Sequence, residues 1–557
     1  MTAEVEGAGT VERSIGRLKG LVSSDWLVLA AILILAAALR VIGLEARGRF
    51  DGDQGHDVLV LLQLVRDGAL PLLGPPTSIG DFHHGAAYYY LLAPAAWLSG
   101  ADPTVVVAWI AILGIAAVGA TWWLGRLMGG PVVAAVAGLV MAVSPAAIEE
   151  STFIWNPNPI PLFAALALGC AWRAHAGATA RAARWWIPAV LCAGVVLQLH
   201  VLGIVFVPPI LALAAVDARA ARRAGDLARA RSIVLSVAGG LVLFALLFVP
   251  LLVHELGSGF EETRHVLDYL AGGGSGDATD RSPIVQVAIT LLRVVGWPLV
   301  GLVTDAPLAA LAAVGATVAL GTWLALAGRG TERSAARWLG LTVVWSALAL
   351  TAVAPSLQTV VAGLPNDHYH AYLDPVVIVL LALGVRAVAR GPERSVDPRV
   401  RVAARAVATV PVAALIVVAL TLAPPSDPNG GWPLARTAGA RIVGLSGPGF
   451  IDVRQLPVFK SAEGVGFPVI VAGGYAVIAT DEASADRIVD PDATLVVACD
   501  RLFEEVMGAA CGGPAEGAYV GRLGLDIRRF APAVRFDLSP RISVSIYRPS
   551  LRSALGR

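Results

Sequence analysis

Long apolar runs, separated by short polar segments, repeat along the chain as far as residue 423. The first run covers residues 26–44 and follows Arg13, Arg17 and Lys19. Runs of similar character lie near 104–124, 131–148, 158–175, 185–200, 201–216, 231–253, 306–327, 338–355, 371–389 and 405–423. Such runs suit helices that cross a hydrocarbon core about 30 Å thick, and the first is longer than the apolar core of a signal peptide. The pattern predicts a polytopic α-helical membrane protein.

Arginine clusters between the runs predict how the chain faces the membrane. The clusters are Arg173, Arg181 and Arg184; Arg219, Arg222, Arg223, Arg229 and Arg231; Arg329, Arg333 and Arg337; and Arg386, Arg390, Arg394, Arg399 and Arg401. Basic loops favour the cytoplasmic side. All four clusters share that side only if two weaker apolar segments, 86–99 and 283–303, lie along the interface. The chain then crosses the membrane about eleven times, and 185–216 forms a tight helical hairpin with its tip at 198–200.

This topology divides the chain into three parts. Residues 1–25 are predicted to form a cytoplasmic tail, residues 26–423 a membrane module, and residues 424–557 an extracytoplasmic domain. The module has outer loops at 45–103, 149–157, 254–305 and 363–371. The high alanine, arginine, valine and glycine content resembles that of GC-rich bacteria, which indicates a multi-pass protein of the plasma (inner) membrane.

The segment after residue 423 has a different character. Turn-forming residues at 424–431 mark a linker. Beyond it, β-like runs at 468–472, 494–498 and 542–547 alternate with helix-like stretches at 483–488 and 502–507, so we expect a small mixed α/β domain. Its two cysteines, Cys499 and Cys511, are either a disulfide, which an oxidising compartment favours, or two free thiols.

The composition agrees with a membrane protein and narrows its partners. Of 557 residues, 56% are hydrophobic and 15% are charged, whereas a soluble protein carries roughly 25% charged residues. A net charge of +1 argues against a nucleic-acid binder. No Walker-type or dinucleotide-type glycine motif occurs in the sequence.

The first outer loop holds the most informative polar residues. Asp51, Asp53 and Asp57 lie directly after the first predicted span and before an amphipathic stretch at 58–66. A solvated acidic loop is the alternative. Gly52 and Gly55 nevertheless favour a specific tight turn, in which a carboxylate would act as a general base.

Most histidines fall in the same outer loops, where a phosphate or a metal would suit adjacent imidazoles. For the tyrosines at 88–90 an aromatic belt at the membrane interface remains an alternative. The candidates for substrate binding are Asp57, His83, His84, Tyr89, Trp155, Asn156, Asn158, His200, His254, Glu255, Arg264, His368, Tyr369 and His370. No cofactor is required by these residues, and a divalent metal held by His83, His254 and Glu255 is left open.

In the order of these features the chain resembles the GT-C superfamily of polyprenyl-phosphate-sugar glycosyltransferases, which includes the protein O-mannosyltransferases and the aminoarabinose transferase of lipid A. In that family an aspartate opens an amphipathic helix that closes at a glycine about fifteen residues later. Asp53 has this spacing to Gly68, so the resemblance implies that Asp53 is the catalytic carboxylate. Gln54 stands where a second acid is usual, and Asp51 or Asp57 would assume that role. His84 stands where a phosphate-contacting lysine is expected.

The first functional hypothesis is therefore an inverting membrane glycosyltransferase. It would take a sugar from a polyprenyl-phosphate carrier and pass it to a cell-envelope glycan, lipid or protein. His84, Arg264 and His368 would stabilise the phosphate leaving group. The alternative is a transporter or flippase of a lipid-linked or polar substrate, which predicts polar residues near mid-bilayer in two related halves. A lipid-binding scaffold without catalysis is the third hypothesis.

Overall fold

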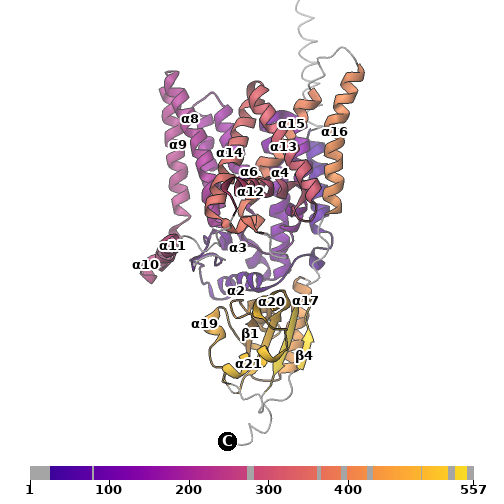
Figure 1. The fold of residues 1–557 in the computed structure, drawn as a ribbon. Helices are drawn as coiled ribbons and strands as arrows, with labels where there is room; N and C mark the ends of the chain where they lie inside the picture. Colours follow the sequence, from indigo (N-terminus) through magenta and orange to yellow (C-terminus); the bar gives the residue numbers. More distant parts are fainter. Residues whose placement is uncertain are drawn as a thin grey trace, which may run out of the picture.

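The protein is described by a computed structural model that covers residues 25–77, 81–271, 281–359, 366–390, 398–422, 431–490, 492–524 and 534–548. A bundle of long helices forms most of it, and a smaller unit built on a sheet packs against one end of the bundle (Figure 1). The prediction of a polytopic helical protein with a C-terminal mixed α/β region is confirmed.

The helical part begins with a helix over residues 25–41. The α-helices that follow are α2 (Gly52–Asp67), α3 (Ala87–Ser99), α4 (Pro103–Val143), α5 (Pro145–Glu149), α6 (Ile160–Ala176), α7 (Trp186–Leu199), α8 (Val207–Arg223), α9 (Leu227–Leu246), α10 (Val249–Ser258), α11 (Glu261–Ala271), α12 (Pro283–Val300), α13 (Pro307–Ala327), α14 (Gly330–Val353), α15 (Asp374–Arg390) and α16 (Pro398–Thr421). Short 3₁₀ helices are η1 (Leu44–Ala46), η2 (Ala182–Trp185), η3 (Val201–Phe206), η4 (Pro355–Gln358) and η5 (Asp367–Leu373).

Eight helices in the described ranges are long and apolar enough to cross a membrane. They are Pro103–Val143, Ala182–Leu199, Val201–Arg223, Leu227–Leu246, Pro283–Val300, Pro307–Ala327, Gly330–Val353 and Asp367–Arg390. Helix α12 is among them, although the sequence places 283–303 along the interface. The interfacial placement of 283–303, the count of eleven spans and the orientation of the termini stay predictions. Helix α3, with 13 residues, is shorter than the roughly 20 residues that a span requires.

Two predicted runs, 104–124 and 131–148, are joined in α4. Its helical geometry breaks at Gly130, where φ is 77°, a left-handed value that glycine adopts without steric cost. A Cβ atom on Gly125 would lie 3.0 Å from the carbonyl oxygen of Val133. One on Gly138 would lie 3.2 Å from the Trp122 side chain. The two halves of α4 therefore fold back on each other as a helical hairpin.

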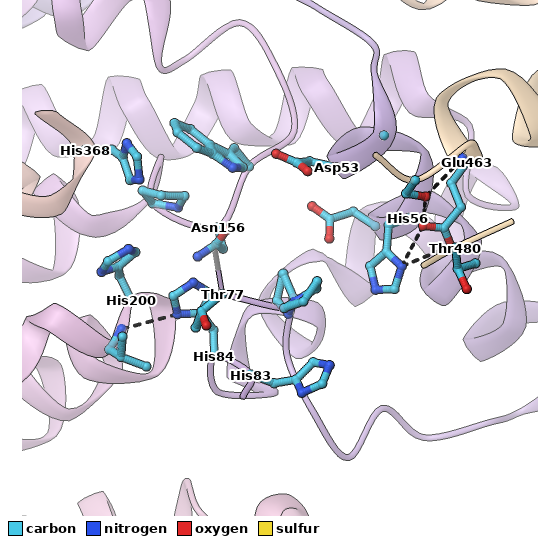
Figure 2. Close-up of a pocket in the computed structure, with 18 of the residues that line it drawn as sticks. Asp53, His56, Thr77, His83, His84, Asn156, His200, His368, Glu463 and Thr480 are labelled. Atoms are coloured by element: carbon cyan, nitrogen blue, oxygen red, sulfur yellow. Dashed lines mark hydrogen bonds and ion pairs between the residues drawn. The ribbon is translucent and has the colours of Figure 1, made fainter. Parts of the chain in front are cut away.

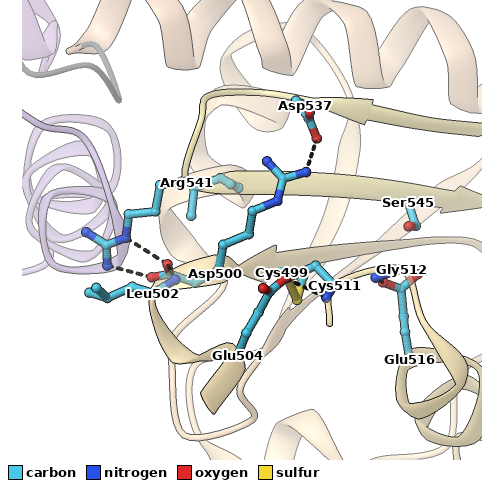
Figure 3. Close-up of a disulfide and its surroundings, with 12 residues drawn as sticks. Cys499, Asp500, Leu502, Glu504, Cys511, Gly512, Glu516, Asp537, Arg541 and Ser545 are labelled. Atoms are coloured by element: carbon cyan, nitrogen blue, oxygen red, sulfur yellow. Dashed lines mark hydrogen bonds and ion pairs between the residues drawn. A yellow bond between two sulfur atoms is a disulfide. The ribbon is translucent and has the colours of Figure 1, made fainter. Parts of the chain in front are cut away.

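The C-terminal unit is a five-stranded mixed sheet with helices. Its elements are α17 (Trp432–Ser446), β1 (Phe450–Leu456), α18 (Glu463–Val471), β2 (Tyr475–Ile478), α19 (Glu482–Ala485), β3 (Thr494–Asp500), η7 (Arg501–Phe503), α20 (Glu504–Met507), α21 (Pro514–Arg522), β4 (Val534–Asp537) and β5 (Ile542–Tyr547). The strand order is β2-β1-β3-β5-β4. Strand β1 pairs in parallel with β2 and β3, whereas β5 is antiparallel to β3 and β4. Cys499 and Cys511 are bonded as a disulfide that ties the end of β3 to the turn before α21 (Figure 3).

The prediction of a strand at 468–472 is wrong, because these residues lie in and just after α18. A Cβ atom on Gly439 of α17 would lie 2.4 Å from the backbone of Pro468, so the two helices pack backbone to backbone. The apolar run at 469–471 is β-like in composition, but tertiary packing of this kind overrides propensity. The predictions at 494–498 and 542–547 are confirmed by β3 and β5.

Candidate functional site

Helix α2 begins with a capping box that fixes the first turn. The Asp51 side chain accepts a hydrogen bond from the Asp53 amide, and the Gln54 side chain accepts one from the Asp51 amide. Such reciprocal bonds satisfy amides that a helix start leaves unpaired. The helix ends at Gly68 in the left-handed conformation. Gln54, which replaces the expected acid, therefore has a structural role at this helix start, and Asp53 projects from the first turn.

A cavity of about 330 Å³ lies where α2 meets the loops of the bundle and the C-terminal unit (Figure 2). Its lining residues are Gly52, Asp53, His56, Asp57, Pro75, Pro76, Thr77, His83, His84, Trp155, Asn156, Pro157, His200, Val201, His368, Tyr369, Ser461, Glu463, Thr480 and Asp481. Nine of the residues predicted for the site are among them: Asp53, Asp57, His83, His84, Trp155, Asn156, His200, His368 and Tyr369. The loops that the sequence analysis places outside, at 45–103, 149–157 and 363–371, thus meet the hairpin tip at 200 in one place.

Asp53 lines the cavity and is exposed to it. Desolvation within the cavity raises the pKa of Asp53 to about 6, and the like charge of Asp51 acts in the same direction. Lys460, His56 and Arg49 oppose the shift through their positive charges. A carboxyl group with this pKa is mostly ionised at neutral pH and is a stronger base than an ordinary aspartate, which suits general-base chemistry.

Asp57, one turn further along α2, has its carboxylate bound by two phenols. The hydroxyls of Tyr88 and Tyr89 donate to it at 2.8 and 2.9 Å. Burial raises the pKa of Asp57 to about 7, against the opposing effects of His56 and the two phenols. These bonds join α2 to α3. Tyr89 therefore supports the site from behind and is not part of the cavity lining.

Two buried histidines form the side of the cavity nearest the bundle. The Nδ1 atom of His84 accepts a hydrogen bond from the Val201 amide at 3.3 Å, and Nδ1 of His200 accepts one from the Leu202 amide at 3.2 Å. An imidazole nitrogen that accepts carries no proton, so in the neutral ring the proton is on Nε2. Burial lowers the pKa of both rings well below the usual value, and neighbouring histidines add to this. His84 and His200 are therefore neutral donors, with ring centroids 4.6 Å apart.

The remaining bundle residues at the cavity surround these rings. The His368 ring lies 4.2 Å from the Trp155 ring and 5.5 Å from that of His200, measured between centroids. The Asn156 amide group donates to the carbonyl oxygen of Leu199 at 2.6 Å, which fixes the loop against the hairpin tip. Tyr369 lies 5.1 Å from the His200 ring. The histidines, His84 and His200 with His368, are called the imidazole wall below.

The C-terminal unit supplies the opposite part of the lining. Ser461, Glu463, Thr480 and Asp481 come from it, and together with Asp53 they are called the oxygen wall below. Both carboxylate oxygens of Glu463 lie 3.1 Å from Nδ1 of His56. Burial acts to lower the pKa of His56, but the hydrogen bond and charge of Glu463, with the charges of Asp57 and Asp53, raise it overall.

Close backbone contact between α2 and α18 makes this junction possible. A Cβ atom on Gly55 would lie 2.3 Å from the carbonyl group of Glu463, and one on Gly464 would lie 2.5 Å from the backbone of Asp51. No side chain fits at either position without moving a helix. Glu463 and its neighbours were not predicted from the sequence, because they lie about 400 residues from Asp53. Gly55 and Gly464, which allow the close contact, were the signal in the sequence that could have indicated it.

Seven predicted residues lie elsewhere, engaged in other contacts or exposed. Besides Asp51 and Tyr89, they are Asn158, His254, Glu255, Arg264 and His370. Asn158 donates to the carbonyl of Phe153, and His370 bonds to Asp367, which is also held by the buried Arg293. His254 lies on α10 and Arg264 is exposed on α11.

The suggested metal ligands do not come together. Glu255 accepts from the backbone of Glu262 and from the Thr263 hydroxyl, so it caps the start of α11. His83 is paired with Glu262 at 2.9 Å. Within the described residues, no group of three or more histidine, cysteine, aspartate or glutamate side chains is arranged to hold a metal ion.

Comparison with solved structures identifies the architecture. ArnT from Cupriavidus metallidurans in the apo state matches with a TM-score of 0.59 and 14% identity, over 94% of this chain and 98% of that one. ArnT bound to undecaprenyl phosphate matches over the same shares, with a TM-score of 0.58 and 14% identity. The chain has the GT-C glycosyltransferase fold.

A more distant GT-C structure agrees. The apo oligosaccharyltransferase of Archaeoglobus fulgidus matches with a TM-score of 0.51 and 12% identity, over 95% of this chain and 74% of that one. No family model and no curated protein matches this chain. The resemblance noted in the sequence is confirmed as a likeness of fold.

Proposed function

We propose that the chain is an inverting glycosyltransferase that moves a sugar from a polyprenyl-phosphate carrier to an acceptor on the outer face of the plasma membrane. One observation carries the proposal: Asp53, a carboxylate with a raised pKa, shares a cavity with two neutral imidazoles fixed as N–H donors. A base and a set of oxyanion donors are what such a transfer requires. The GT-C fold and the carrier lipid bound to ArnT support the same donor class.

In the proposed reaction the acceptor oxygen or nitrogen attacks the anomeric carbon of the sugar. A new bond forms there while the bond from that carbon to the phosphate oxygen breaks, and its electron pair goes to the phosphate. The acceptor proton passes to Asp53. The Nε2–H groups of His84 and His200 donate to the phosphate as it gains charge. Because Asp53 and these imidazoles lie apart across the cavity (Figure 2), attack opposite the leaving group, and hence inversion, is expected.

In this proposal His84 contacts the phosphate as a neutral donor, at the position where the family resemblance implies a lysine. A lysine would meet the phosphate as a cation, whereas His84 meets it as a preorganised N–H group on a buried ring, where such dipoles act strongly. The acceptor, which is a cell-envelope glycan, lipid or protein, would enter beside Asp53. No step of the proposed reaction requires a metal ion.

The first experiment identifies the substrates. Glycans and glycolipids of a deletion strain are compared with those of its parent by mass spectrometry, and the loss of one defined sugar names donor and acceptor. Transfer is then measured with purified protein. Asp53→Asn is expected to lower kcat by about 1000-fold, because it removes the base without changing the shape.

Asp51→Asn is the matched control, since asparagine also caps a helix start. We expect it to lower kcat by less than about tenfold, because Asp51 acts only through the helix start and its charge. Full transfer by Asp53→Asn would refute Asp53 as the base. Absence of transfer by the wild type would instead favour a scaffold, or a transporter if the lipid-linked sugar still changed sides.

A further inference from the structure

The oxygen wall lies at one edge of the C-terminal sheet. Ser461 and Glu463 follow β1, and Thr480 and Asp481 follow β2. Because β1 and β2 are parallel neighbours, the segments after their carboxyl ends emerge side by side. Ligands commonly bind at such an edge in α/β sheets. Here the edge faces Asp53 across the junction with α2 (Figure 2).

Every side chain in this wall ends in oxygen. Two are hydroxyls and three are carboxyls, and no lysine or arginine is present among the described residues that line the cavity. The Glu463 side chain is 7% exposed and accepts from His56 and from the Ser461 hydroxyl, the latter at 2.7 Å. The Asp481 carboxylate accepts from the Ser484 amide at 2.7 Å as the cap of α19, and hydrogen bonds from Ser484 lower the pKa of Asp481. Asp53 and Asp481 therefore carry negative charge at neutral pH.

The imidazole wall has the opposite preference. The Nδ1 atoms of His84 and His200 are held by backbone amides, which leaves their Nε2–H groups as donors. Among the described residues no carboxylate bonds to these donors, and they suit an anionic oxygen. The cavity thus separates a place for one anion from a place that carries the carboxyl groups of Asp53, Glu463 and Asp481.

We infer that the acceptor is an uncharged polyhydroxyl compound, a sugar unit of a glycan or glycolipid, which donates its hydroxyls to the oxygen wall. This inference rests on the proposed function. Carboxylates and hydroxyls accept well from vicinal sugar hydroxyls. A phosphate beside the reacting hydroxyl would face Glu463 and Asp481, while the nearby basic side chains are engaged elsewhere, His56 with Glu463 and Lys460 over the Phe503 ring. Like charges placed together at an interface are strongly unfavourable.

The test compares two soluble probes with the full-length protein in lipid nanodiscs. One is an alkyl glucoside, and the other is the same glucoside carrying a 6-phosphate. We expect kcat/KM for the uncharged probe to exceed that for the phosphorylated probe by at least about tenfold. Asp481→Asn keeps the cap of α19, removes one charge, and should shrink that ratio at least about threefold without changing KM for the donor.

Glu482→Gln is the matched control, because this exposed neighbour removes the same charge outside the cavity lining, and it should leave the ratio unchanged. The inference is overturned if the phosphorylated probe reacts as well as the uncharged one, or if Asp481→Asn and Glu482→Gln change the ratio equally.

A binding measurement separates this inference from the proposed function. Calorimetric titration of Asp53→Asn with each probe reports the preference without turnover. Preferential binding of the uncharged probe, together with no transfer by the wild type from any polyprenyl-phosphate sugar, would support the oxygen wall as a glycan site and reject the glycosyltransferase. Transfer to both probes without a preference in binding would reject the glycan site and keep the enzyme.

Discussion

The imidazole wall and the oxygen wall of the cavity are assembled in different ways. The rings of His84 and His200 are oriented by the amides of Val201 and Leu202, all within or beside one helical hairpin of the bundle. The oxygen wall instead exists only where α18 docks on α2, with backbones in contact at Gly55. The leaving-group chemistry is therefore built into the membrane module, whereas the selectivity for the acceptor depends on how the C-terminal unit sits.

The largest effect that tests this contrast is expected at His84. In His84→Asn the side-chain oxygen still accepts from the Val201 amide, but no donor reaches the place of Nε2–H. Loss of one such donor costs about 100- to 1000-fold in kcat. His84→Gln places an amide group near the Nε2 position and should recover at least about tenfold of that loss. Equal rates for both variants would show that His84 only supports the hairpin tip.

Docking of the oxygen wall is tested at Gly55. A methyl group there would lie 2.3 Å from the backbone of Glu463, so Gly55→Ala forces α2 and α18 apart. Misplacement by about 1 Å can cost about 100-fold in rate, and we expect a loss of that order together with a weaker preference for the uncharged acceptor probe.

Gly257→Ala is the control for Gly55→Ala, because it adds the same methyl group to helix α10, where nothing lies within 4 Å. We expect a rate close to that of the wild type. If Gly55→Ala retains both rate and preference, the oxygen wall does not depend on this contact.

The same contrast explains what the sequence could predict. The imidazole wall and Asp53 come from segments whose character is local: an acidic turn before an amphipathic helix, adjacent histidines, and a hairpin tip between basic clusters. Helix α2 ends at Gly68, as the family resemblance implies. Strand β5 occupies the predicted residues 542–547, because alternating apolar and polar positions are a local signal.

The oxygen wall could not be predicted from the sequence, because it depends on contacts between distant segments of the chain. Glu463 meets His56 across 407 positions of sequence, and no periodicity encodes a contact of that range. Within the same segment, 468–472 has a β-like composition, but its helix packs closely against α17 at Pro468. Likewise, Glu255 and Asn158 are polar residues in the predicted outer loops, yet they cap or brace their own loops, which composition alone does not distinguish from ligand binding.

The smallest expected effect is the pH dependence of transfer. The rate should fall at low pH if Asp53 must be ionised, and at high pH if the imidazole wall must be protonated. Asp53 must be ionised to accept a proton, and its pKa is about 6, so kcat/KM should level off above neutral pH and fall about tenfold by roughly pH 5. Asp51→Asn removes the like charge that raises this pKa and should move the midpoint to lower pH. His56→Gln removes a positive charge that lowers the pKa of Asp53 and should move the midpoint to higher pH.

The imidazole wall should add no further pH dependence near neutrality, because His84 and His200 have pKa values lowered well below the usual value and act as neutral donors. If the midpoint moves in neither variant, the limb belongs to another group, and Asp57→Asn tests the carboxyl whose pKa is about 7. If the rate instead falls as pH rises through about 6.5, and this fall disappears in His84→Gln, the imidazole wall acts as a cation.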